Sequence, residues 1–218
     1  MNTMKRTLLI LALTSLVLSS KAQPLKMGIK GGISSTSVKF DKTTITSGTD
    51  QYIVEQGDSK VGFHIGLFAR LQIMGFYLQP ELLFSHSEGE VTLNDVSMEQ
   101  VFNETQKFNK FDIPVMVGWK FGPARVGFGP VATILVSEND GLKDKLQELT
   151  NQAVENNFNS ATFGYQVGVG LDILKTLTID LKYEGNLSKL GSGITLGDTN
   201  YSFDQRNPQF IMSVGLFF

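Results

Sequence analysis

The sequence Phe-Ile-Met-Ser-Val-Gly-Leu-Phe-Phe, residues 210–218, ends in an aromatic side chain. The residues at positions 210, 212, 214, 216 and 218 are all apolar, which is the two-residue period of a β-strand with one face against an apolar environment. A strand of this kind at the end of a chain predicts a closed barrel, because the last strand can pair with the first and leave no free sheet edge.

Seven further segments alternate in the same way. In residues 60–71, for example, Val61, Phe63 and Ile65 share one face, whereas Gly62 and His64 share the other. Each segment is long enough to cross a bilayer at a tilt, which takes about 9 to 11 residues. The eight predicted strands cover residues 25–37, 60–71, 75–87, 108–121, 124–137, 161–174, 176–188 and 207–218.

The connections between these segments alternate in length. Those after the second, fourth and sixth segments are tight, whereas the others run to about twenty residues. Short turns on one side and long loops on the other are typical of an outer-membrane barrel, whose short turns and both termini face the periplasm. We therefore predict an all-β fold, an eight-stranded antiparallel up-and-down transmembrane β-barrel, in which Phe218 is the C-terminal signal for the barrel assembly machinery.

The amino-terminal region has the pattern of a cleavable signal peptide. Lys5 and Arg6 precede an apolar run that ends at Leu18, and Ser20-Lys21-Ala22 supplies small side chains for cleavage. We expect residues 1–22 to be the signal peptide and residues 23–218 to be a single barrel domain. The chain contains no cysteine, so disulfides, thiol metal sites and lipid attachment at a cysteine are excluded.

A secreted lipid-binding barrel of the lipocalin type would show the same alternation with its apolar face inward. Glycines on the polar face favour the membrane barrel, since they relieve crowding inside a narrow lumen and would weaken strands on a solvent face. We therefore predict the outer membrane of a Gram-negative bacterium, with membrane lipid as a partner. The glycines concerned are Gly62, Gly66, Gly118, Gly127, Gly129, Gly164, Gly168 and Gly170.

Charged residues on the polar face predict an ion network in the lumen. An eight-stranded barrel is just wide enough for side chains to fill it, so charges inside must be paired. Lys30, Glu81 and Lys182 fall near mid-depth and are expected to form a cluster with Asp180. A path for protons or ions is the alternative. The predicted network comprises Lys30, Arg70, Glu81, Asp180, Lys182 and Glu184.

Two more features are predicted outside the lumen. Leu142, Leu146, Leu149 and Ala153 have the spacing of a short amphipathic helix within residues 138–160, placed to cap the barrel mouth. Aromatic residues near the short turns predict an interfacial girdle made of Phe76, Trp119, Phe121, Phe128 and Phe218.

Catalysis and nucleic-acid binding find little support. The chain has 19 basic and 21 acidic residues and no basic tract beyond the signal peptide, which argues against nucleic acid. Of the two histidines, His64 points inward, and the neighbours of His86, Ser85 and Ser87, point to the opposite face. We predict no enzymatic activity, no metal and no cofactor. An acyl-transfer enzyme using His86 and a cross-strand serine is the alternative.

Several motifs resemble the PorT-like outer-membrane β-barrel family across residues 25–218. They include Gly28-Ile29-Lys30-Gly31-Gly32, Gly62-Phe63-His64-Ile65-Gly66 and Leu78-Gln79-Pro80-Glu81-Leu82-Leu83-Phe84-Ser85. The resemblance implies a small eight-stranded barrel without an agreed active site, in a family of which some members are linked to protein secretion across the outer membrane. Pro80 and Pro114 within strands are expected to mark bulges.

The function predicted from these features is that of a monomeric, non-enzymatic barrel. It would serve the cell envelope, as a structural or interaction protein or in outer-membrane protein secretion, with its long outer loops as the surface for an envelope or secretion partner. The alternative is a narrow porin-like channel, or a conduit for small or hydrophobic molecules.

Overall fold

The computed structural model describes residues 25–36, 39, 42–47, 50–150, 152–197 and 199–218. The predicted signal peptide lies outside these residues. No helix within the described part of the chain is long and apolar enough to cross a membrane.

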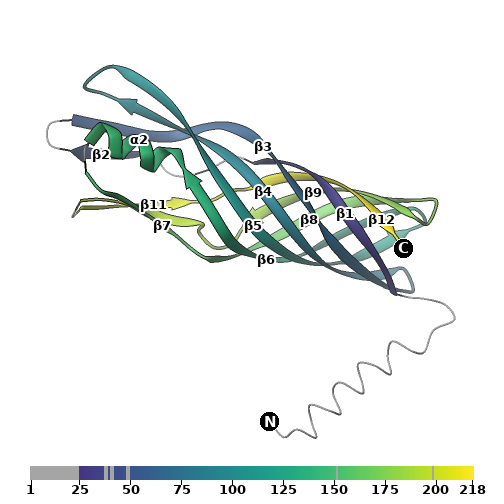
Figure 1. The fold of residues 1–218 in the computed structure, drawn as a ribbon. Helices are drawn as coiled ribbons and strands as arrows, with labels where there is room; N and C mark the ends of the chain where they lie inside the picture. Colours follow the sequence, from purple (N-terminus) through teal and green to yellow (C-terminus); the bar gives the residue numbers. More distant parts are fainter. Residues whose placement is uncertain (1–24, 37–38, 40–41, 48–49, 151, 198) are drawn as a thin grey trace, which may run out of the picture.

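Eight antiparallel strands form a closed ring (Figure 1). Each strand of the ring pairs with the ring strands that come before and after it in the sequence. The last strand, β12, pairs with the first, β1, from Gly28 opposite Phe217 to Thr36 opposite Gln209. This pairing closes the barrel and confirms the predicted fold class. The ring consists of β1 (Leu25–Thr36), β3 (Asp50–Ile73), β4 (Phe76–Asp95), β5 (Gln100–Phe121), β6 (Ala124–Asp140), β8 (Ala161–Ile173), β9 (Leu177–Asn186) and β12 (Gln209–Phe217).

Tight turns connect the strands at one end of the barrel, which we call the turn end. The turns span residues 74–75, 122–123 and 174–176. Gly75 and Gly122 adopt positive φ angles of 86° and 60° there, a conformation that glycine reaches without strain. The short connections are thus where the sequence predicts them.

Four strands run further than the sequence analysis predicts. β4 continues to Asp95 and β5 starts at Gln100, so the expected loop of about twenty residues is a hairpin with a four-residue turn, 96–99. The prediction of a long loop there is wrong. The two-residue period continues beyond residue 87, but the apolar residues Val91 and Leu93 now lie on the face that was polar before, and the pattern therefore resembles a loop.

The strand extensions and the remaining connections form a second region, which we call the head. It comprises the ends of β3 to β6 beyond the barrel together with β2 (Thr43–Ser47), α2 (Gly141–Thr150), β7 (Val154–Phe158), β10 (Gly191–Leu196) and β11 (Thr199–Gln205). β11, β10 and β7 form a separate three-stranded sheet. Figure 1 shows these elements gathered at the end of the barrel opposite the turns.

Helix α2 confirms the helix predicted within residues 138–160. It starts after Asp140, whose Oδ1 accepts a hydrogen bond of 3.0 Å from the backbone N–H of Leu142 and so caps the helix. Leu142 and Leu146 are fully buried, four residues apart on one helix face. That face packs into the head rather than lying free over the barrel mouth.

The head has an apolar core of its own. Side chains from five strands, β2, β3, β4, β7 and β10, and from helix α2 meet there. The ten buried members of this core are Ile45, Tyr52, Val54, Val91, Leu93, Leu142, Leu146, Val154, Ile194 and Leu196. The connections predicted as long outer loops therefore contribute to a packed layer.

The prolines within the barrel strands interrupt the ladder without forming bulges. Pro80 lies opposite Val115, and the pairing of Leu83 with Asp112 keeps the same register. On β5, Pro114 lies opposite Val131, and the next pair, Val117 with Phe128, has the same register. The expectation of bulges at Pro80 and Pro114 is wrong, because each missing N–H removes a bond while no extra residue enters the strand.

Candidate functional site

The centre of the barrel holds a cluster of four buried charges. Lys30 Nζ lies 2.7 Å from Glu81 Oε1 and 2.7 Å from Asp180 Oδ2, and Lys182 Nζ lies 2.8 Å from the same oxygen of Glu81. These side chains come from β1, β4 and β9 and point inward because each has the parity of the polar face. The structure thus brings together the four residues expected at mid-depth.

A second cluster lies between the centre and the turn end. Arg70 Nη1 is 2.8 Å from Asp172 Oδ2, and Lys120 pairs with the same carboxylate. Arg125 bonds both Asp172 and Asp180 and so connects this cluster to the central one. Arg70 therefore does not contact Lys30 or Glu81 directly, and Asp172 and Arg125 are network members that the predicted set omits although they share its parity.

The predicted member Glu184 lies on the head side of the centre. Its carboxylate accepts hydrogen bonds from Gln166 Nε2 at 2.7 Å and from Gln209 Nε2 at 2.8 Å. Gln166 Oε1 also accepts a bond of 3.2 Å from Lys182, which links Glu184 to the central cluster. A single chain of ion pairs and hydrogen bonds therefore runs along the lumen from Arg70 to Gln209.

Aromatic rings and glycines fill the remaining width of the lumen. A Cβ atom added at Gly127 would lie 2.0 Å from Tyr77 Oη, so the Tyr77 ring occupies space that any larger residue at 127 would take. Arg70 and Arg125 stack against the same ring, with centroid distances of 5.7 and 5.8 Å. The luminal glycines thus make room for large side chains.

Two small cavities lie in the lumen towards the head. Their volumes are about 20 and 10 Å³, which is room for about one water molecule each. Ser87 Oγ, Asn186 Oδ1 and Asn207 Oδ1 line the larger cavity and have no hydrogen-bond partner among the described residues.

The two histidines differ in their surroundings. His64 Nε2 lies 2.8 Å from Ser213 Oγ inside the barrel, where both side chains are buried and line the smaller cavity. A nucleophile and base need space for a substrate, and this cavity has none. His86 lies on the outer surface, with Nδ1 2.8 Å from Asn109 Oδ1 and its ring stacked on Phe63. Within the described part of the chain, no three His, Asp or Glu residues are grouped to bind a metal.

The outer surface of the barrel is apolar and is bounded by aromatic rings. Near the turn end, Phe76 contacts Trp119 edge to face at 5.4 Å. The predicted girdle residues are between 41 and 79% exposed on this surface. A second group near the head was not predicted and comprises Phe63, Phe84, Phe111, Tyr183 and Phe210.

The separation of the two aromatic groups matches the thickness of a membrane. On β4, Phe76 is paired with Trp119 of the girdle, and His86, ten residues further on, is paired with Phe63 of the second aromatic group. Ten residues of strand span about 33 Å, or about 25 Å along the axis at a tilt of about 40°, which equals the apolar band of about 25 Å in membrane barrels.

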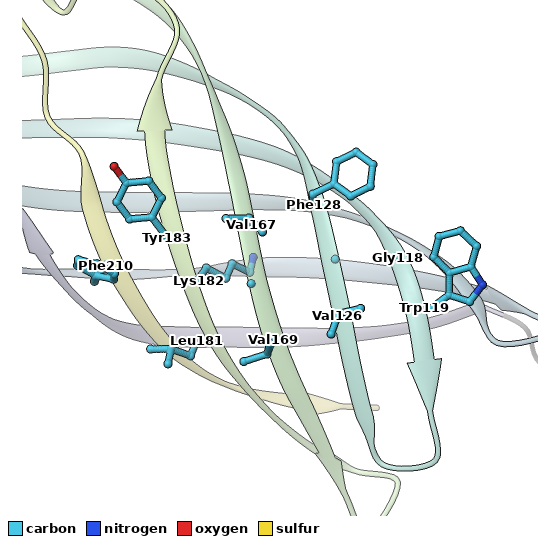
Figure 2. Close-up of a pocket in the computed structure, with 12 residues that line it drawn as sticks. Gly118, Trp119, Val126, Phe128, Val167, Val169, Leu181, Lys182, Tyr183 and Phe210 are labelled. Atoms are coloured by element: carbon cyan, nitrogen blue, oxygen red, sulfur yellow. The ribbon is translucent and has the colours of Figure 1, made fainter.

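A groove of about 520 Å³ runs along this apolar surface over β5, β6, β8, β9 and β12. Figure 2 shows Trp119 and Phe128 on one side and Tyr183 and Phe210 on the other. Between these aromatic walls lie Val126, Val167, Val169 and Leu181.

A closed ring of eight strands with a polar, filled interior and an apolar outer band between aromatic levels defines an integral membrane β-barrel. The chain belongs to the family described as "Outer membrane protein beta-barrel domain", whose model matches residues 20–192. It is therefore a protein of the Gram-negative outer membrane.

The chain is similar to solved structures of outer-membrane proteins, and the similarity to OprG supports the barrel fold. OprG from Pseudomonas aeruginosa is 10% identical with a TM-score of 0.54, and the match covers 88% of this chain and 95% of OprG. Ail of Yersinia pestis is 12% identical (TM-score 0.43, 89% of this chain and 99% of Ail), and the protease OmpT from Escherichia coli is 10% identical (TM-score 0.45, 92% and 99%). No curated protein sequence matches the chain.

Proposed function

We propose that this chain is a sealed, non-enzymatic outer-membrane barrel whose role is to hold the head at one side of the membrane as an interaction surface. The observation that supports a sealed barrel is the continuous luminal network from Arg70 to Gln209, together with cavities of about 20 and 10 Å³. Breaking buried ion pairs to open a path would leave unpaired charges, which costs several kcal/mol.

The head supports the interaction role. It is a packed layer rather than a set of loose loops, so its surface is held in a defined shape. The hairpin between β4 and β5 ends in Val96, Met98 and Val101, which are 48, 59 and 63% exposed. Apolar side chains at a projecting tip are available for contact with a partner protein in the envelope. The PorT-like resemblance makes a secretion partner the candidate of interest.

We further propose that the head faces the cell exterior and that the turn end and both termini face the periplasm, which is the usual orientation of short turns in such barrels. The chain has no cysteine, so single cysteines report sidedness cleanly. Ser97→Cys in the head should react with an impermeant maleimide on intact cells. Lys175→Cys at the turn end should react only after the cells are lysed. The reverse pattern would refute this orientation.

Other parts of the proposal concern assembly. The barrel has no free edge, which supports a monomer. Phe218, an exposed member of the girdle at the turn end, is accessible for recognition by the barrel assembly machinery before insertion. Deletion of Phe218 should then lower the amount of folded protein in the outer membrane while refolding in detergent stays efficient.

Single-channel recording in planar bilayers tests the sealed lumen. The refolded protein is first shown to migrate faster unheated than heated on a gel, and the same preparation is then inserted in bilayers. We expect no conductance steps from the folded protein. Steady ohmic conductance would overturn the proposal and favour the narrow channel. The unpartnered oxygens of Ser87, Asn186 and Asn207 in the larger cavity are the observation that favours this second candidate.

A further inference from the structure

The groove on the barrel surface has the chemistry of a site for an acyl chain. Apolar side chains line it, and its head-side wall is a pair of contacting rings, Tyr183 and Phe210, with centroids 5.2 Å apart. The floor between the walls is built from shorter side chains, with Val167 and Val169 at its centre. A flexible chain can lie between these walls, where a flat barrel surface would offer no lateral hold.

Two cations lie beyond this wall, towards the head. Lys39 and Arg206 form a bridge in which each backbone N–H donates to the other's carbonyl, at 2.7 and 2.8 Å. The bridge continues the register of β1 and β12, in which Thr36 lies opposite Gln209. Arg206 is exposed with the parity of Phe210, and Lys39 is exposed opposite it, so both side chains lie on the outer surface.

This pair of like charges is unusual. Two cations directly opposite each other on antiparallel strands repel and destabilise the pairing. Among the side chains that the structure describes, those of residues 202–205 not included, no ion pair joins either cation to an acidic group. An anion bound between them would offset the repulsion.

The depth of the pair in the membrane fits a lipid headgroup. Arg206 lies four residues beyond Phe210, which is about 13 Å along the strand and about 10 Å along the axis at a tilt of about 40°. The headgroup layer extends about 5 to 8 Å beyond the hydrocarbon. Arginine and lysine side chains are long enough to reach back over the remaining distance.

We propose that the groove and the Lys39–Arg206 pair together form a binding site for one phosphate-bearing anionic lipid of the leaflet on the head side. An acyl chain lies between the aromatic walls, and the phosphate lies between the two cations. The site does not require the lumen or a partner protein, and it holds whichever side of the membrane the head faces.

Native mass spectrometry of the refolded protein tests this site. The protein is released from micelles that contain equal amounts of dioleoyl phosphatidylglycerol and dioleoyl phosphatidylcholine, and the ratio of the two retained lipids is measured. The wild type should retain one phosphatidylglycerol preferentially. Arg206→Gln and Lys39→Gln should each lower the ratio about fivefold, the effect expected for one cation near a lipid headgroup.

Matched variants separate the two parts of the site. Lys175→Gln removes an exposed cation at the turn end and should leave the ratio unchanged. Val167→Trp fills the groove and should reduce retention of both lipids, whereas Ile29→Trp, on the outer face of β1 away from the groove, should not.

Three results would overturn the proposal. The first is an unchanged ratio in both cation variants. The second is equal retention in Val167→Trp and the wild type, because the groove would then hold no chain. The third is loss of the retained lipid on addition of excess inorganic phosphate, which would identify a site for a free anion rather than for a lipid. Folding of each variant is verified by its heat-modifiable migration.

Discussion

The barrel and the head are built from the same strands with opposite polarity. On β4, the inward face carries Gln79, Glu81 and Ser85 within the barrel and then Val91 and Leu93 within the head. Its outward face changes in the opposite sense, from leucine and phenylalanine to the series Glu88, Glu90, Thr92 and Asn94. The inward face of one strand is therefore polar in the barrel and apolar in the head. The change near residue 87 marks the boundary between the part of the strand that faces lipid and the part that faces water.

The two regions must be stabilised by different forces. In the barrel, the apolar face lies against lipid and the interior is polar, so satisfied hydrogen bonds and ion pairs hold the strands to one another across the lumen. In the head, water surrounds the polar face, and the ten-residue core supplies the hydrophobic stabilisation. Removal of a buried charge should therefore destabilise the barrel, and removal of a buried apolar side chain should destabilise the head.

Removal of the central carboxylate should have the largest effect. Glu81 receives ion pairs from both Lys30 and Lys182, so Glu81→Gln leaves two buried ammonium groups short of a partner. We expect the barrel to lose about 3 to 5 kcal/mol, measured by urea-induced unfolding in lipid vesicles. Glu90→Gln is the matched control, since Glu90 pairs with Lys60 at the exposed surface of the head and should change stability little.

A normal melting temperature for Glu81→Gln combined with altered ion flux in bilayers would contradict this prediction. That result would mean that the central charges line a path instead of holding the strands together.

A cavity in the head core should unfold the head and spare the barrel. Leu146 is fully buried on α2 within the apolar core. Leu146→Ala should cost the head about 3 kcal/mol, visible as lost amide protection in α2, β7 and β10 by hydrogen exchange. The heat-modifiable band should stay, because the ring of strands is closed without the head. Loss of the folded band would show that the two regions fold as one unit.

A charge placed on one face of one strand should distinguish lipid from water. Leu82 is 49% exposed on the outward face of β4 in the barrel, and Thr92 lies on the same face in the head. Leu82→Arg should cost about 2 to 4 kcal/mol because the side chain meets hydrocarbon. Thr92→Arg should stay within about 0.5 kcal/mol of the wild type. Equal costs would mean that the boundary near residue 87 is misplaced.

Most of the barrel follows from side-chain parity alone. A period of two assigns Lys30, Glu81 and Lys182 to the lumen without any knowledge of the third dimension. Which charges meet is a different matter, because depth depends on strand tilt and stagger. Arg70 accordingly pairs with Asp172 rather than with the central cluster. Lys110, on the inward parity beside Asp112, could have been found by the same parity argument.

The head could be predicted only in part. The spacing of Leu142 and Leu146 indicates α2, because helical periodicity is local. α2 shares its apolar core with Ile45, Leu93 and Ile194, which lie far apart in the sequence. No local pattern in the sequence reports that these residues meet in one core. The alternation through Val91 and Leu93 is present but inverted, and an inverted pattern is recognised only once the membrane boundary is known.

The smallest effect concerns pH and is confined to the head. Burial raises the pKa of Glu104, and the acidic residues Glu148, Asp144 and Asp140 add to the shift against the effect of Lys145. A raised pKa means that the folded head binds protons more readily than the unfolded chain, so this contribution is present at low pH and is lost as the pH rises through the folded pKa, above 4.5. Glu90 acts in the opposite sense, because its hydrogen bond with Lys60 lowers its pKa and that contribution is lost below 4.5.

Protection of the α2 amides, corrected for intrinsic exchange rates, should therefore rise modestly between pH 7 and about pH 5. Glu104→Gln should remove the rise and Glu90→Gln should not. A slope that survives in Glu104→Gln would assign it to another group of the head, such as Glu138, whose pKa burial also raises.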